Sequence, residues 1–176
     1  IVFALTLVAP ARAERLRIAF LNAEMSQKGP GLLLQALRKG GTPQTDALAQ
    51  VVAEVAPDVL VLAGVDYDHG LVTLSALADA LAAKGATAYP HRFALRPNIG
   101  MQTGIDMDGD GRIGGPGDAQ GFGYFNGADG LAILSRYPVD HAGVRDFSGF
   151  LWRDLPDNLI EVETLPPKAI DMQRLA

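Results

Sequence analysis

An acidic, glycine-rich stretch between residues 106 and 118 offers the most specific chemistry in the sequence. Aspartates at alternate positions followed by glycine are typical of the opening of a calcium-binding loop, because a tightly turned chain can aim several carboxylates at one point. Calcium prefers about six to eight oxygen ligands. The pattern therefore predicts a structural calcium site built from Asp106, Asp108, Asp110, the backbone carbonyl of Arg112, and Asp118.

Two features separate this stretch from a complete EF-hand. Gly117 stands where the last acidic ligand is usual, so Asp118 would close the ligand set one residue later. The flanks are rich in glycine and lack helical periodicity, so residues 98–130 are interpreted as an inserted loop. The alternative is an ordinary acidic turn, since aspartate and glycine are also common turn residues. Without a cation, however, the clustered carboxylates would repel one another.

Alternating strand and helix patterns surround this loop. The run at 59–63 is continuously apolar, which is typical of a strand covered on both faces. Thr42 and Pro43 suit the start of a helix, and Gly85 suits the end of another. The order favours a layered α/β fold. The predicted strands are 16–21, 59–63, 92–95, 131–135 and a partner strand at 142–147, and the predicted helices begin at 43 and span 71–84.

The composition is that of a globular protein of one domain. The chain has 176 residues, of which 48% are hydrophobic, so it can bury a sizeable core. Its formal net charge of −5 disfavours broad electrostatic binding to nucleic acid. It has no cysteine, which excludes disulfides, thiolate metal sites and a thiol nucleophile.

The first thirteen residues resemble the end of a secretory signal peptide. An apolar run at 1–9 is followed by Ala11-Arg12-Ala13, a pattern typical of a cleavage site. The run is shorter than the roughly 20 residues that a membrane-spanning helix needs. We therefore expect a signal-peptide remnant at 1–13, a domain at 14–176, and a secreted or periplasmic location. A buried first strand is the alternative for residues 1–13.

Three segments, taken in order, resemble strands of the endonuclease/exonuclease/phosphatase superfamily, which has the fold of pancreatic deoxyribonuclease. They are Arg-Ile-Ala-Phe-Leu-Asn at 17–22, Ala-Pro-Asp-Val-Leu-Val-Leu at 56–62, and Gly-Leu-Ala-Ile-Leu-Ser-Arg-Tyr-Pro at 130–138. The resemblance covers about residues 16–147. It implies a layered α/β sandwich of the deoxyribonuclease type, which we expect to be truncated to roughly its N-terminal half.

The resemblance also implies a catalytic site. Family members hydrolyse phosphate esters with a divalent cation, usually Mg²⁺, and Asn22 matches the family asparagine that orients the metal and the phosphate. The metal-binding glutamate of the family falls on Gly64, which has no side chain to offer. Asp66, two residues further along the strand, is the predicted replacement, with Asp68 as a second candidate.

The later Asp-x-Asn and Asp-His motifs of the family have no match in this sequence. We therefore expect residues 1–176 alone to be inactive. Because a sandwich cut to half loses the sheet on which its inner face packs, we also expect this fragment to be marginally stable or prone to aggregate. The leading interpretation is an extracytoplasmic, metal-dependent phosphoesterase-like domain that is catalytic in its complete form. The alternative is a non-catalytic secreted calcium-binding domain on the same scaffold. The class of phosphate ester and the oligomeric state stay open.

Overall fold

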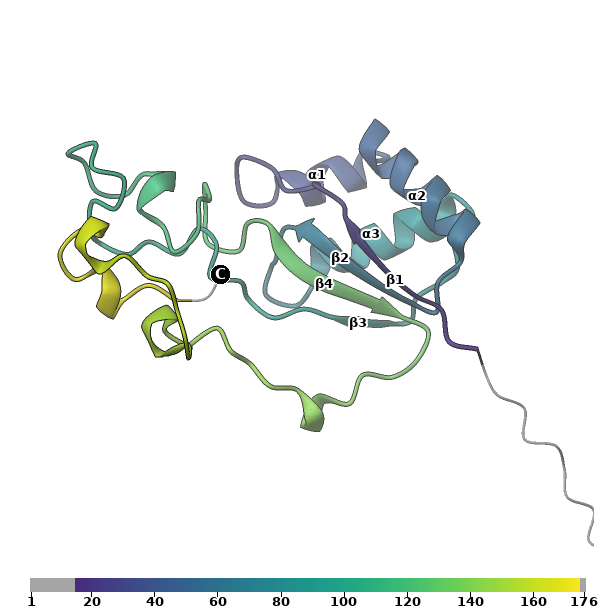
Figure 1. Ribbon diagram of the computed structural model, residues 1–176. Helices are drawn as coiled ribbons and strands as arrows, with labels where there is room; N and C mark the ends of the chain where they lie inside the picture. Colours follow the sequence, from purple (N-terminus) through teal and green to yellow (C-terminus); the bar gives the residue numbers. More distant parts are fainter. Residues whose placement is uncertain (1–14, 175–176) are drawn as a thin grey trace, which may run out of the picture.

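The computed structural model describes residues 15–174, so the predicted signal peptide lies outside the described residues. Its strands form one four-stranded sheet in the order β1-β2-β4-β3 (Figure 1). β1 and β2 are parallel, whereas β4 runs antiparallel to both β2 and β3. The strands are β1 (Ile18–Asn22), β2 (Val59–Val65), β3 (His91–Phe93) and β4 (Gly130–Ser135).

Three helices cover one face of this sheet: α1 (Leu32–Arg38), α2 (Pro43–Val55) and α3 (Val72–Ala83) (Figure 1). Their leucines pack with Leu62 and Leu134 into a single core. The layered α/β class is thus confirmed, while the second sheet of a sandwich and the truncation stay predictions. No helix in the described part of the chain is long and apolar enough to cross a membrane.

The prediction that β2 is covered on both faces was wrong. Its side chains alternate between buried and half-buried along most of the strand, because the helices pack on one face only. The opposite face of the sheet carries exposed apolar side chains from β1 and β4, among them Phe20 and Leu131, which are 67% and 62% exposed.

Local signals explain the helix boundaries. The Thr42 hydroxyl accepts a hydrogen bond from the backbone N–H of Thr45, and Pro43 occupies the first turn of α2, as predicted. Gly85 follows α3 with a left-handed φ of 94°, also as predicted. Helix α1 was not predicted, because its seven residues are too few for helical periodicity to be recognised in the sequence. Its buried leucines, 33 and 37, are spaced four residues apart.

The partner strand predicted at 142–147 does not form. A short 3₁₀ helix at His141–Gly143 stands there instead, and the Asp140 carboxylate accepts a hydrogen bond from the backbone N–H of Ala142. Both edges of β4 are already paired, one with β2 and the other with β3, so no edge is left for a further strand.

Asp58 joins the three segments that carry the family resemblance. Its carboxylate accepts hydrogen bonds from the backbone N–H of Arg17, before β1, and from the guanidinium of Arg136, after β4, at 2.8 and 2.6 Å. The backbone hydrogen bond from Arg17, with the charge of Arg136, lowers the pKa of Asp58. One carboxylate therefore fixes the relative register of these strands at one end of the sheet.

At the other end of the sheet, β2 departs from regular pairing between Leu62 and Val65. Gly64 lies there with a φ of +78°, a conformation that favours glycine. A Cβ atom at this position would lie 2.7 Å from the backbone nitrogen of Glu24 and 3.0 Å from its Cα. The chain that follows β1 therefore crosses directly over Gly64.

We predict that Gly64→Ala destabilises the domain by roughly 2–4 kcal/mol, because left-handed strain adds to a clash with backbone atoms. Gly31→Ala is the matched control, since Gly31 has a φ of +74° and open space around the missing Cβ. It should cost only the strain, about 1–2 kcal/mol. Urea unfolding of both variants measures the difference, and equal losses would contradict the tight crossing over Gly64.

Candidate functional site

Polar side chains from segments far apart in the sequence meet where β1 and β2 end and β4 begins. Parallel pairing places the ends of β1 and β2 side by side, and antiparallel pairing brings the start of β4 to the same edge. A pocket of about 390 Å³ opens there. It is lined by Asn22, Glu24, Ser26, Gln27, Lys28, Phe122, Gly123, Tyr124, Ala128 and Asp129.

Asn22 and Glu24 form the exposed polar edge of this pocket. The side-chain amide of Asn22 donates a hydrogen bond to the Glu24 carboxylate at 3.3 Å. Asn22 thus lies at the strand end where the resemblance placed it. Sequence reasoning missed Glu24, because no local pattern shows that the chain after β1 crosses over Gly64 with a left-handed φ at Glu24.

Asp66 reaches the same end of the sheet but lies beneath the pocket. It is 5% exposed, and it accepts hydrogen bonds from the Ser26 hydroxyl at 2.5 Å and the backbone N–H of Gln27 at 3.2 Å. Burial raises the pKa of Asp66, although both hydrogen bonds work against that shift. Asp66 therefore holds the segment after β1 in place and does not line the pocket with Asn22.

Asp68, the second candidate, caps helix α3. Its carboxylate accepts hydrogen bonds from the backbone N–H groups of Val72 and Thr73 at 2.7 and 2.6 Å. Partial burial works to raise the pKa of Asp68, but these hydrogen bonds outweigh it and lower the pKa. The capping geometry gives this aspartate a structural task at the first turn of the helix.

The pocket offers oxygen donors of the kind that a divalent cation binds, even though Gly64 offers no side chain. Asn22 and Glu24 contribute an amide oxygen and carboxylate oxygens to this pocket, and the Oδ1 atom of Asn22 lies 3.2 Å from the point that a Cβ of residue 64 would occupy. Oxygen donors of this kind are those that magnesium prefers. The segment that carries Glu24 therefore occupies the space that a side chain at position 64 would fill.

The pocket also holds a cation of its own. The Nζ atom of Lys28 lies 5.7 Å from the centroid of the Tyr124 ring, which also lines the pocket. The ammonium group of Lys28 therefore adds positive charge to the pocket, which favours an anion such as a phosphate group. Of the three histidines, none is among the lining residues described for this pocket, and His91 and His141 lie at the opposite end of the sheet.

A second acidic group lies in the long loop between β3 and β4 (Figure 1). Asp106, Asp108 and Asp118 each offer a carboxylate oxygen within 4.8 Å of the others. Asp118 is 1% exposed, and it accepts hydrogen bonds from the backbone N–H groups of Met107 and Gly114. These backbone hydrogen bonds, that of Met107 above all, lower the pKa of Asp118. Three of the five predicted calcium ligands are therefore brought together.

Of the predicted carboxylate ligands, Asp110 lies outside this close group. The Asp110 carboxylate accepts a hydrogen bond from the backbone N–H of Arg112 at 2.8 Å, which forms a local turn.

The loop that carries the acidic group is also hydrogen-bonded to the C-terminal part of the described chain. The side chain of Gln120 donates to the carbonyl of Met172 and accepts from the N–H of Arg174.

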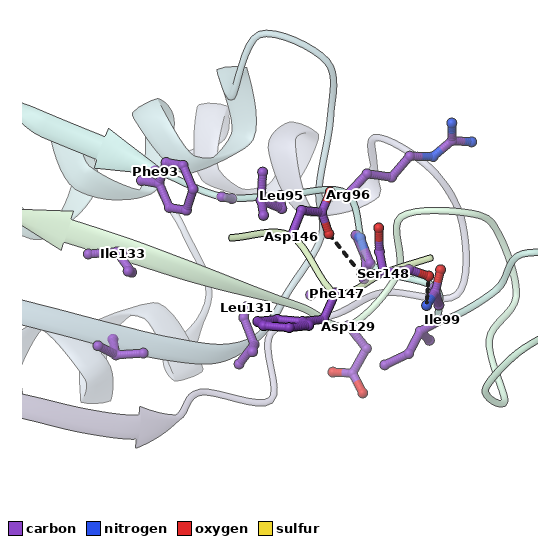
Figure 2. Close-up of a pocket in the computed structure, with 15 residues that line it drawn as sticks. Phe93, Leu95, Arg96, Ile99, Asp129, Leu131, Ile133, Asp146, Phe147 and Ser148 are labelled. Carbon is purple, nitrogen blue, oxygen red and sulfur yellow. Dashed lines mark hydrogen bonds between the residues drawn. The ribbon is translucent and has the colours of Figure 1, made fainter. Parts of the chain in front are cut away.

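A larger, mainly apolar groove of about 550 Å³ lies on the sheet face that the helices leave uncovered. Figure 2 shows Phe93 and Ile133 at one end, and Arg96, Asp129 and Ser148 gathered at the other. Asp129 lines both this groove and the polar pocket. The groove has the greater volume, but the polar pocket has the amide, carboxylate and ammonium groups that phosphate chemistry requires.

Comparison with known proteins identifies the family of this chain. A family model described as "Endonuclease/Exonuclease/phosphatase family" matches residues 21–172. No curated protein and no solved structure gives a significant match. The family consists of phosphoesterase-like and nuclease-type hydrolases that generally use divalent metal ions. Since the match spans most of the chain, from the end of β1 through β4 and beyond, the chain belongs to the endonuclease/exonuclease/phosphatase family.

Proposed function

We propose that this domain provides the metal- and phosphate-binding part of a phosphoesterase centre, located at the pocket that Asn22 and Lys28 line. The observation that carries the proposal is the position of Asn22. The chain belongs to this family, and the asparagine that resembles the family's active-site asparagine lines a pocket that also contains carboxylate groups and a lysine.

Each pocket residue has a separate task in this proposal. The Asn22 amide orients a phosphate oxygen, and Lys28 offsets the negative charge of the phosphate. Asp66 is a positioning residue, because it fixes the backbone of the segment that carries these groups. Mg²⁺, when bound, would stabilise the charge that develops on the phosphoryl oxygens.

The acidic loop supports a second candidate function, the non-catalytic binding of calcium. The observation that favours it is the close group of Asp106, Asp108 and Asp118. Asp110 and the carbonyl of Arg112 complete the proposed ligand set. An extracytoplasmic location, which we propose from the signal-peptide pattern at 1–13, would supply calcium at concentrations that suit a weak site.

We predict that Asn22→Ala weakens binding of dimethyl phosphate in the presence of Mg²⁺ by roughly ten- to a hundredfold, since a hydrogen bond to a charged group contributes about 1.5–3 kcal/mol. NMR titration of the purified protein measures the affinity. Gln50→Ala, at an exposed position of α2, is the control and should leave binding unchanged. Equal affinity of Asn22→Ala and the control would contradict the proposed site.

We also predict that residues 1–176 alone do not hydrolyse bis(4-nitrophenyl) phosphate above a metal-free control. An attacking water needs a base to accept its proton. None of the three histidines lines the pocket, and Asp66 is buried beneath it. Release of 4-nitrophenolate is measured with Mg²⁺ or with a chelator, and metal-dependent turnover would show that a base is already present.

For the loop, we predict that calcium stabilises the protein and that Asp108→Asn abolishes this effect. At a calcium concentration one hundred times Kd, the gain in unfolding free energy is about 2.7 kcal/mol. Asparagine preserves the hydrogen bond that Asp108 accepts from the N–H of Asp110, so the variant removes charge with little change of shape. Calorimetry and thermal unfolding with and without calcium provide the measurements.

Two further variants complete the calcium experiment. Asp110→Asn tests whether this residue belongs to the ligand set, and weaker calcium binding is expected. Asp157→Asn removes one negative charge from an exposed position outside the loop and should change nothing. An absence of binding heat in the parent protein, or equal binding by Asp108→Asn, would contradict the calcium site.

A further inference from the structure

The geometry at Gly64 excludes an acidic side chain from the position where the family resemblance places the metal-binding glutamate. The backbone there has a φ of +78°, and the space for a Cβ is filled by the N and Cα atoms of Glu24. A glutamate could not be accommodated without moving the segment after β1. The carboxylate of this site must therefore come from a different part of the chain.

Glu24 is held beside Gly64 by backbone pairing that continues past the end of β1. The N–H of Ala23 donates to the carbonyl of Ala63 at 2.9 Å, and the N–H of Met25 donates to the carbonyl of Gly64 at 2.8 Å. Glu24, between these two hydrogen bonds, has a left-handed φ of 46°, which is uncommon for a residue other than glycine. The two unusual conformations belong to one backbone arrangement, in which Glu24 lies over Gly64.

The Glu24 carboxylate is also available. It is exposed, and within residues 15–174 no lysine, arginine or histidine forms an ion pair with it. Its described partner is the amide of Asn22, which the family uses at its metal site. The alternative carboxylate, Asp66, is buried and already accepts hydrogen bonds from Ser26 and Gln27.

We propose that Glu24 supplies the metal-binding carboxylate that the family draws from the position of Gly64. The ligand group has moved from the end of β2 to the segment that follows β1, while the neighbouring asparagine has kept its place. This inference rests on the proposed function, because it assigns a ligand to the same metal and phosphate pocket.

The test uses Mn²⁺ as the probe and Asp108→Asn as the background, so that binding at the acidic loop is suppressed. Electron paramagnetic resonance measures the affinity for Mn²⁺, and NMR measures broadening of the Asn22 side-chain amide by the bound ion. Glu24→Gln removes the charge but can still accept the hydrogen bond from Asn22. We expect Mn²⁺ affinity to fall at least tenfold and the broadening at Asn22 to disappear.

Three further variants make the result specific. Glu24→Asp keeps a carboxylate on a shorter side chain and should retain part of the affinity. Glu54→Gln, on the exposed face of α2, should behave like the background protein. Asp129→Asn neutralises the other exposed carboxylate that lines the pocket and should weaken Mn²⁺ binding less than Glu24→Gln does. Circular dichroism establishes that each variant is folded.

The outcomes separate this inference from the proposed function. If Mn²⁺ broadens the Asn22 amide equally in Glu24→Gln and in the background protein, the assignment of Glu24 is overturned and the pocket stands. If Asp129→Asn shows the greater loss, the carboxylate belongs to Asp129. If Mn²⁺ leaves the Asn22 amide unaffected in the background protein, the metal pocket itself is overturned.

Discussion

The close approach of the chain to Gly64 determines how this end of the sheet is built. The backbone of residues 23–25 pairs with Ala63 and Gly64 so tightly that a Cβ at position 64 would meet backbone atoms. Backbone atoms cannot move aside as a flexible side chain can. The glycine is therefore a steric requirement of this crossing, and the absence of the family glutamate follows from the same constraint that places Glu24 beside Asn22.

Asp66 supports this crossing from below. Its buried carboxylate accepts hydrogen bonds from Ser26 and Gln27, and the backbone N–H of Asp129 donates to the Ser26 hydroxyl. A buried carboxylate stabilises the backbone conformation that donates hydrogen bonds to its oxygens, because burying these oxygens without hydrogen bonds is costly. The end of β2, the segment after β1 and the start of β4 are thereby held together. These hydrogen bonds lie beneath the pocket and connect the segments that form it.

Much of the fold could be predicted because its signals are local. The apolar runs at 59–63 and 131–135 and the caps at Thr42 and Gly85 each depend on neighbouring residues. The site was predicted less well. Asn22 was found by resemblance, but the burial of Asp66 and the role of Glu24 depend on a contact between β1 and β2 across some forty residues. No pattern within a short window of the sequence contains that contact.

The acidic loop and the polar pocket are parts of one connected structure. The chain leaves the acidic group at Asp118 and reaches the pocket wall at Phe122 and Tyr124 within a few residues. Backbone hydrogen bonds from Thr103 to Asp118 and from Gly123 to Pro116 hold this short connection against the rest of the loop. A cation that ordered the loop would therefore order one wall of the pocket. The proposed calcium site and the proposed phosphate-ester site are therefore compatible within one domain, because the loop that would bind calcium also lines the pocket that would bind the phosphate ester.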